Sequence, residues 1–165
     1  MALSASLQKA INDQIQLEFA SHYAYLAKSA WLAERSLGGA ASWMRQQAME
    51  EHAHAMKLVD FLLDRGASVS LQAIPAMGGK WKSVLQVFES AQAHEQKVSA
   101  SIHRLYALAL KAGDYPAQTM LHWFITEQVE EEASSAAIVD RLRMAGDNPA
   151  ALLMLDAELG ARKGD

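Results

Sequence analysis

Residues 44–62 read MRQQAMEEHAHAMKLVDFL, and this stretch decides the fold. Apolar residues recur in it every three or four positions, from Met44 to Leu62, which is the period of a helix that buries one face. Glu51 and His54 stand on the same face, three residues apart, in the middle of the apolar run. The stretch therefore predicts a helix that packs against other helices and carries two polar groups into their common interior.

Glycine and proline are scarce, with 9 and 3 of 165 residues, and they divide the chain into long segments without helix breakers. Gly38-Gly39 is expected to form the first turn, and Gly66 to end the second helix. The pattern predicts helices over about residues 6–37, 40–65, 82–112 and 115–145, and a short one over 149–159.

The long connection over residues 66–81 sets the topology. A segment of this length reaches roughly 50 Å when extended, whereas a helix of about 26 residues is roughly 39 Å long. The segment can therefore return along the whole bundle, which makes the second and third helices parallel, while short turns make the other neighbours antiparallel. We predict an all-α fold: a four-helix bundle with one long crossover loop and a short fifth C-terminal helix, as a single domain over residues 1–165.

Composition excludes several classes of protein. The formal net charge is −4 and no run of Lys and Arg occurs, so no nucleic-acid partner is expected. The chain has no cysteine, which excludes disulfides, thiol catalysis and zinc–thiolate sites and fits a cytoplasmic protein. No stretch approaches ~18 continuous apolar residues, and no signal peptide is expected, so no membrane partner is predicted.

Each long helix carries one glutamate near the middle of its apolar face: Glu18, Glu51, Glu95 and Glu131. The middle of a helix lies at the same level whether the helix runs up or down, so the four carboxylates should meet in the bundle centre. Burying them uncompensated costs several kcal/mol per ion, and no Lys or Arg is expected at this level. Divalent cations would offset that cost, and the Glu51-x-x-His54 pair adds an imidazole. Such ligands suit Fe(II), Mn or Zn better than Ca or Cu.

One such glutamate alone would more often be a misplaced surface residue, but four at one level favour a carboxylate-bridged di-iron site. Further motifs lie around these glutamates in the sequence, and the predicted short last helix begins at Asn148-Pro149. The motifs are Glu18 with Tyr25, Glu50-Glu51-His52-Ala53-His54, Glu95, and Glu127-Gln128-Val129-Glu130-Glu131. On these motifs and the crossover loop, the chain resembles the non-haem ferritins of bacteria over essentially its whole length.

The resemblance implies an iron-storage protein with ferroxidase activity. It would oxidise Fe(II) to Fe(III) with dioxygen or peroxide at an intrasubunit di-iron centre. The product would be stored as a ferric oxo-hydroxide mineral inside a homo-oligomeric cage of 24 subunits. One iron would be held by Glu18, Glu51 and His54, and the other by Glu51, Glu95 and Glu131, with Glu51 as the bridge.

The resemblance also implies roles beside the two irons. Gln128 would orient oxygen or a bound water, and Tyr25 would donate an electron, unless it is only a packed core tyrosine whose hydroxyl meets a ligand carboxylate. Glu50, Glu127 and Glu130 would form a third iron site; the alternative is a solvated acidic face.

Two departures separate the chain from bacterioferritins, which have a second Glu-x-x-His and a haem-binding methionine. Ser134 stands where that histidine would be and His52 where the methionine would be, so no haem is expected. The main alternative function is a non-storage di-iron oxidase or peroxidase of the erythrin type, which usually pairs with a cysteine-rich domain that this chain lacks. A DNA-protecting mini-ferritin and a metal-free structural bundle are further alternatives.

Overall fold

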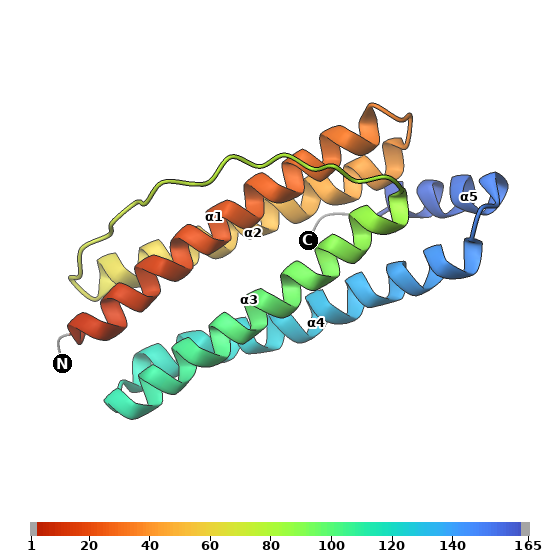
Figure 1. The fold of residues 1–165 in the computed structure, drawn as a ribbon. Helices are drawn as coiled ribbons and strands as arrows, with labels where there is room; N and C mark the ends of the chain where they lie inside the picture. Colours follow the sequence, from red (N-terminus) through yellow and green to blue (C-terminus); the bar gives the residue numbers. More distant parts are fainter. Residues whose placement is uncertain (1–2, 163–165) are drawn as a thin grey trace.

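Each breaker-free segment of the sequence is a helix in the computed structural model, which describes residues 3–162. The four long helices lie side by side, and the short one lies across one end of them (Figure 1). The predicted all-α fold with a short fifth helix is confirmed. The helices are α1 (Ala5–Ala33), α2 (Gly38–Asp64), α3 (Val84–Ala112), α4 (Tyr115–Ala145) and α5 (Pro149–Gly160).

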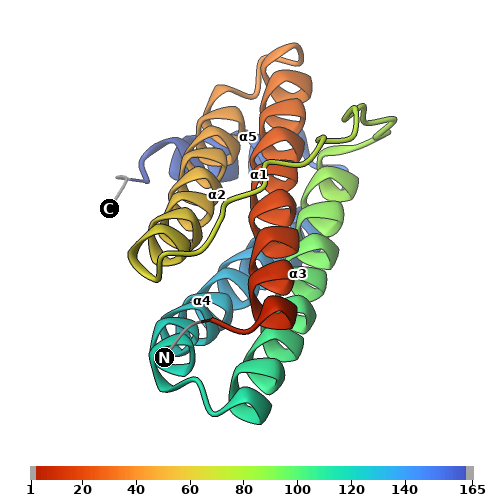
Figure 2. The ribbon, with the colours of Figure 1, turned by 90° about the vertical axis from the view of Figure 1, so that its left-hand side faces the viewer.

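The crossover loop runs along the length of the bundle, from the end of α2 to the start of α3, and passes over α1 (Figures 1 and 2). Side chains of α1 hold it by its backbone. Asn12 Oδ1 accepts from Ser70 N at 2.6 Å, and Gln16 Nε2 donates to the carbonyl oxygen of Ala73 at 2.8 Å. As predicted, α2 and α3 run in the same direction.

The first turn differs from the prediction. We expected a helix to Leu37 and a turn at Gly38-Gly39, but α1 ends at Ala33 and both glycines belong to the first turn of α2. The chain reverses over residues 34–37, where Ser36 has a φ of 61°. Gly39 is needed for a different reason, because a Cβ there would lie 1.7 Å from the backbone carbonyl oxygen of Asp156 in α5.

The other helix ends lie within two residues of the prediction. The second helix ends at Asp64 instead of Arg65, and the fifth extends to Gly160. The third begins at Val84, because Ser83 caps it by accepting from the backbone N–H of Gln86 at 3.2 Å. The fourth spans 115–145 as predicted.

The buried apolar side chains form two clusters, one toward each end of the bundle. One cluster includes Met44 and Phe88, and the other includes Leu58 and Ile102. Buried polar side chains lie between the two clusters, Glu51 among them. The interruption of the apolar faces at one level, predicted from the sequence, is therefore present in the structure.

Candidate metal centre

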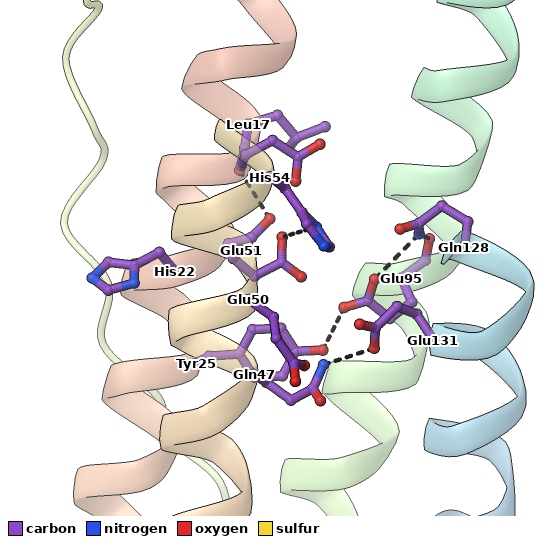
Figure 3. Close-up of polar contacts among 12 residues, drawn as sticks. Leu17, His22, Tyr25, Gln47, Glu50, Glu51, His54, Glu95, Gln128 and Glu131 are labelled. Atoms are coloured by element: carbon purple, nitrogen blue, oxygen red, sulfur yellow. Dashed lines mark hydrogen bonds and ion pairs between the residues drawn. The ribbon is translucent and has the colours of Figure 1, made fainter. Parts of the chain in front are cut away.

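The polar layer contains all four predicted glutamates. Figure 3 shows Glu51 and His54 on α2, Glu95 on α3, and Gln128 and Glu131 on α4, with their side chains turned toward one another. These residues and Glu18 of α1 are between 0 and 7% exposed. Helical spacing turns these side chains to the same side. Glu51 and His54 are three residues apart, as are Gln128 and Glu131, so each pair shares one face of its helix.

Glu18, Glu51 and His54 form the first group that could hold a metal ion. One ligand atom from each lies within 4.8 Å of the others, and His54 Nδ1 lies 3.8 Å from Glu51 Oε2. Among the residues described, Glu18 Oε2, both carboxylate oxygens of Glu51 and His54 Nδ1 are buried without a hydrogen-bond partner. Each such atom costs about 1–3 kcal/mol. A cation bound between them would offset that cost, so the residues fit a metal ion.

Hydrogen bonds orient the carboxylates on the other side of the layer. Gln47 Nε2 donates to Glu131 Oε2 at 2.7 Å. The hydroxyl of Tyr25 donates to Glu95 Oε1, and Gln128 Nε2 lies 3.3 Å from Glu95 Oε2. Tyr25 is fully buried, so the predicted contact of its hydroxyl with a ligand carboxylate is present.

The second group that could hold a metal ion consists of His54, Glu127 and Glu131, again with ligand atoms within 4.8 Å of one another. Glu127 is half-buried. The predicted grouping of Glu131 with Glu51 and Glu95 around one iron therefore stays a prediction, since Glu95 belongs to neither group in the described chain.

The predicted third-site residues lie in three different environments. Glu127 is in the second group, as described above. Glu50 is half-buried, and its carboxylate pairs with Arg162, whose Nη2 lies 2.8 Å from Glu50 Oε1. Glu130 is exposed. The structure thus brings one of the three, Glu127, to His54 and Glu131.

Burial changes the protonation of these carboxyl groups. Desolvation, followed by the negative charge of Glu51, raises the pKa of Glu18 well above its ordinary value of 4.5. Desolvation and the charge of Glu95 do the same to the pKa of Glu51. Burial also raises the pKa of Glu131 to about 7. Without metal, the layer therefore holds protons at neutral pH, and a bound cation must displace them.

Sequence reasoning missed one buried cation. We expected no Lys or Arg near the carboxylates, yet Lys28 is only 4% exposed and lies one turn beyond Tyr25 on α1. Its Nζ is 5.0 Å from the centroid of the Tyr25 ring and 5.8 Å from that of Trp81. Burial lowers the pKa of Lys28 to about 8, against the opposing charges of Glu95 and Glu51. The spacing from Tyr25 was the available signal, since residues three apart share a helix face.

The chain is similar to known proteins of one family. A family model described as a ferritin-like domain matches residues 8–145. The chain belongs to the ferritin family. Among curated members, the bacterial non-heme ferritin of Staphylococcus haemolyticus is 37% identical over 163 residues, which cover 99% of this chain and 98% of the relative. The predicted family and its iron-storage class are confirmed.

Solved structures of ferritins have the same fold as this ferritin chain. An engineered closed form of the Archaeoglobus fulgidus ferritin superposes with a TM-score of 0.97 at 40% identity, covering 99% of this chain and 100% of that one. A novel open-pore ferritin from the same archaeon matches with the same TM-score, identity and coverage. The subunit fold therefore accommodates both a closed and an open-pore form and does not choose between them.

Within residues 3–162, no helix combines the length and the apolar character that crossing a membrane requires.

Proposed function

We propose that this ferritin stores iron and has ferroxidase activity at the centre between its four long helices. The observation that carries the proposal is the group of Glu18, Glu51 and His54, whose buried ligand atoms lie within 4.8 Å of one another. Several of these atoms have no hydrogen-bond partner in the described chain. Without a metal ion, these buried carboxyl groups must bind protons to lower the cost of their charge, whereas a bound cation offsets that charge directly.

The reaction has Fe(II) as its substrate. Two Fe(II) ions each lose one electron. Dioxygen takes both electrons with two protons to give hydrogen peroxide, or peroxide takes both with two protons to give two waters. Binding two donors at one centre matches them to a two-electron acceptor, and this proximity lowers the barrier. The Fe(III) product hydrolyses in water and leaves as ferric oxo-hydroxide.

Different residues of the chain hold the two Fe(II) ions. Glu18 and His54 hold one Fe(II), Glu95 and Glu131 hold the other, and Glu51 contacts both. Hydrogen bonds from neighbouring side chains keep the second pair in place, as outer residues do in many metal sites: Gln47 donates to Glu131, and Tyr25 and Gln128 donate to Glu95.

Tyr25 has two compatible roles in this proposal. Its fully buried ring packs in the core, and its hydroxyl donates to Glu95. Burial and the charge of Glu95 raise the pKa of Tyr25 well above its ordinary value of 10.0, which keeps the phenol protonated. If the ring supplies an electron to the oxidant, the hydroxyl proton can pass along the existing hydrogen bond to Glu95.

Storage requires assembly and a route for iron beyond the centre. Glu127 is proposed to form the third iron site together with Glu50 and Glu130. Its proximity to His54 and Glu131 supports this role. The exposed Leu153 and Met154 of α5 support association with further copies of the chain, for which we propose a closed cage of 24 subunits.

Two measurements test the proposal. Size-exclusion chromatography should give a particle of about 430 kDa from subunits of 18.0 kDa. Anaerobic titration should show two Fe(II) bound tightly per subunit, and stopped-flow absorbance should show their rapid oxidation by dioxygen or peroxide. A small oligomer that oxidises Fe(II) would instead support a non-storage di-iron oxidase or peroxidase. A chain that neither binds nor oxidises Fe(II) would refute both functions.

A further inference from the structure

The chain returns to the metal centre two residues beyond α5. The half-buried Arg162 lies against α2, where its Nη2 pairs with Glu50 Oε1 and Oε2 at 2.8 and 3.1 Å. Its Nη1 donates to Gln47 Oε1. The guanidinium carbon is 5.3 Å from the centroid of the Trp43 ring, and the backbone oxygen of Arg162 accepts from Gln46 Nε2 at 3.1 Å. These contacts give one arginine a defined position beside two residues of the polar layer.

The contact with Gln47 reaches the centre itself. Gln47 is fully buried, and its amide nitrogen donates to Glu131 Oε2 at 2.7 Å. A glutamine amide can turn by 180° and exchange its oxygen and nitrogen. A guanidinium has only donors, so Arg162 requires the amide oxygen to face it and the amide nitrogen to face Glu131. Arg162 thus fixes the orientation of the hydrogen bond that holds Glu131.

The contact with Glu50 acts on charge. Glu50 directly precedes Glu51, and its negative charge raises the pKa of both Glu51 and Glu131. Both of its carboxylate oxygens meet the guanidinium of Arg162. A metal ion that binds Glu50 must therefore displace a fixed positive charge that forms a two-point ion pair.

The fold places Arg162 there through the packing of α5 on α2. A Cβ added to Gly160 would lie 3.0 Å from the Cα of Gly39, so the two backbones nearly touch. Asp156 accepts from the backbone N–H groups of Gly39 and Ala40 at 3.1 and 2.7 Å. These contacts anchor the helix that ends just before Arg162.

We propose that Arg162 is a positioning residue of the metal centre: it holds Glu131 through Gln47, and its ion pair with Glu50 keeps the guanidinium in place beside Gln47. The inference rests on the proposed function, because it assumes that the centre binds two cations. It assigns this residue, which follows α5, a role in the affinity of metal binding.

The test is calorimetric titration of the full-length, metal-free protein with Zn(II), which binds carboxylate and imidazole ligands without redox chemistry. Arg162→Met is the main variant, because it removes the donors and keeps an apolar side chain against Trp43. We expect the wild type to bind two equivalents per subunit. The variant should bind one of them about tenfold more weakly, because Glu131 loses its support.

A control variant separates this effect from a loosening of α5. Arg141→Ala is the matched control, since Arg141 pairs with Glu158 of α5 but touches neither Gln47 nor Glu50 in the described contacts. It should bind Zn(II) like the wild type. Arg162→Gln replaces the main variant if the latter does not assemble.

The possible outcomes distinguish a failure of the role of Arg162 from a failure of the proposed function. If the wild type binds two equivalents and the Arg162 variant binds the same two with the same affinity, the inference is wrong and the proposed function stands. If Arg141→Ala changes binding as Arg162→Met does, loosening of α5 is the cause and the positioning role is wrong. If the wild type itself binds no Zn(II), the proposed function fails.

Discussion

Glu51 occupies the position on which the other ligands depend. It shares a possible metal site with Glu18 and His54, and both of its carboxylate oxygens are buried without a hydrogen-bond partner in the described chain. Its carboxyl group also interacts electrostatically with Glu95 and Glu131 on the other side of the layer. His54 also reaches both sides, since it belongs to both groups that could hold a metal ion, and the bridging role of Glu51 stays a prediction.

We expect Glu51→Ala to lower the initial rate of Fe(II) oxidation by about two orders of magnitude or more, because both irons lose a ligand. Glu18→Ala should cause a smaller loss, since one iron keeps all its ligands. Stopped-flow absorbance at two Fe(II) per subunit measures both. The metal-free protein should melt at an unchanged or higher temperature, because a buried carboxylate is removed. An equal loss of rate in the two variants, or a large loss of stability, would contradict the bridging role.

The burial of Lys28 leads to a second prediction at the scale of single residues. Burial lowers its pKa from 10.5 to about 8, so the charged amine destabilises the folded protein at pH 7. Lys28→Met should raise the free energy of unfolding of the metal-free protein at pH 7 by about 1–3 kcal/mol, after allowance for the lost contact with Tyr25. Folded Lys28 loses its proton earlier than the unfolded residue, so the advantage should shrink as the pH rises from 8 to 10.5. Denaturant unfolding at pH 7 and pH 10 measures this, and a constant difference would contradict the assignment.

At the scale of helices, α5 is fastened to the start of α2 and not only to its neighbour in sequence, α4. The N-terminus of α2 has no capping side chain of its own at Leu37. Asp156 of α5 supplies the cap by accepting from two of the first N–H groups, where a negative charge also interacts favourably with the helix dipole. The same contact requires a glycine at position 39, where the two backbones meet.

Gly38 and Gly39 therefore form a matched pair for a test of this contact. Gly39→Ala should destabilise the protein by several kcal/mol or detach α5, because its Cβ would overlap the backbone of Asp156. Gly38→Ala has open space around the new Cβ and should be neutral or gain up to about 1 kcal/mol. Thermal melts and the rate of proteolysis within α5 measure the difference. Equal stability of the two variants would show that α5 does not dock where the structure has it.

At the scale of the whole molecule, a layer of buried acids separates two apolar clusters, and its cost depends on pH. A carboxyl group whose pKa is raised by folding binds more protons when folded than when unfolded. Its contribution to the free energy of unfolding is therefore greatest below the unfolded pKa of about 4.5 and falls as the pH rises through the folded pKa, which is about 7 for Glu131. Glu18, Glu51 and Glu95 shift in the same direction.

We therefore expect the metal-free protein to melt at lower temperature as the pH rises from 5 to 8, with Glu131 alone contributing about 3 kcal/mol. His94 has the opposite effect on stability over part of this pH range, because burial lowers its pKa from 6.5 to about 4. It is a single group, whereas four buried carboxyl groups act in the other direction. With Zn(II) present the trend should reverse, since the cation binds deprotonated ligands. Calorimetric melts of the wild type and of Glu131→Gln, which should have a weaker pH dependence, measure this. Stability that rises with pH in the metal-free wild type would contradict the buried acidic layer.

The four long helices and the level of their glutamates could be predicted from the sequence, because both depend on local periodicity. The spacing of Glu51 and His54 puts them on one helix face whatever the rest of the chain does. The length of the crossover segment then predicted the direction of α3. The finer assignments, namely two irons, a third site and a cage in the cytoplasm, stay predictions.

Only the tertiary structure decided the contacts between residues far apart in the chain. Gly39 looked like a turn residue, but the backbone of Asp156, more than a hundred residues later, is what requires a glycine there. Lys28 is buried by the packing of α1 beside Trp81. The return of Arg162 to Gln47 has no local signal at all. Periodicity is a property of neighbours in sequence, whereas these contacts depend on how whole helices pack. The sequence pattern therefore predicts the residues of the centre but not the contacts that surround and hold them.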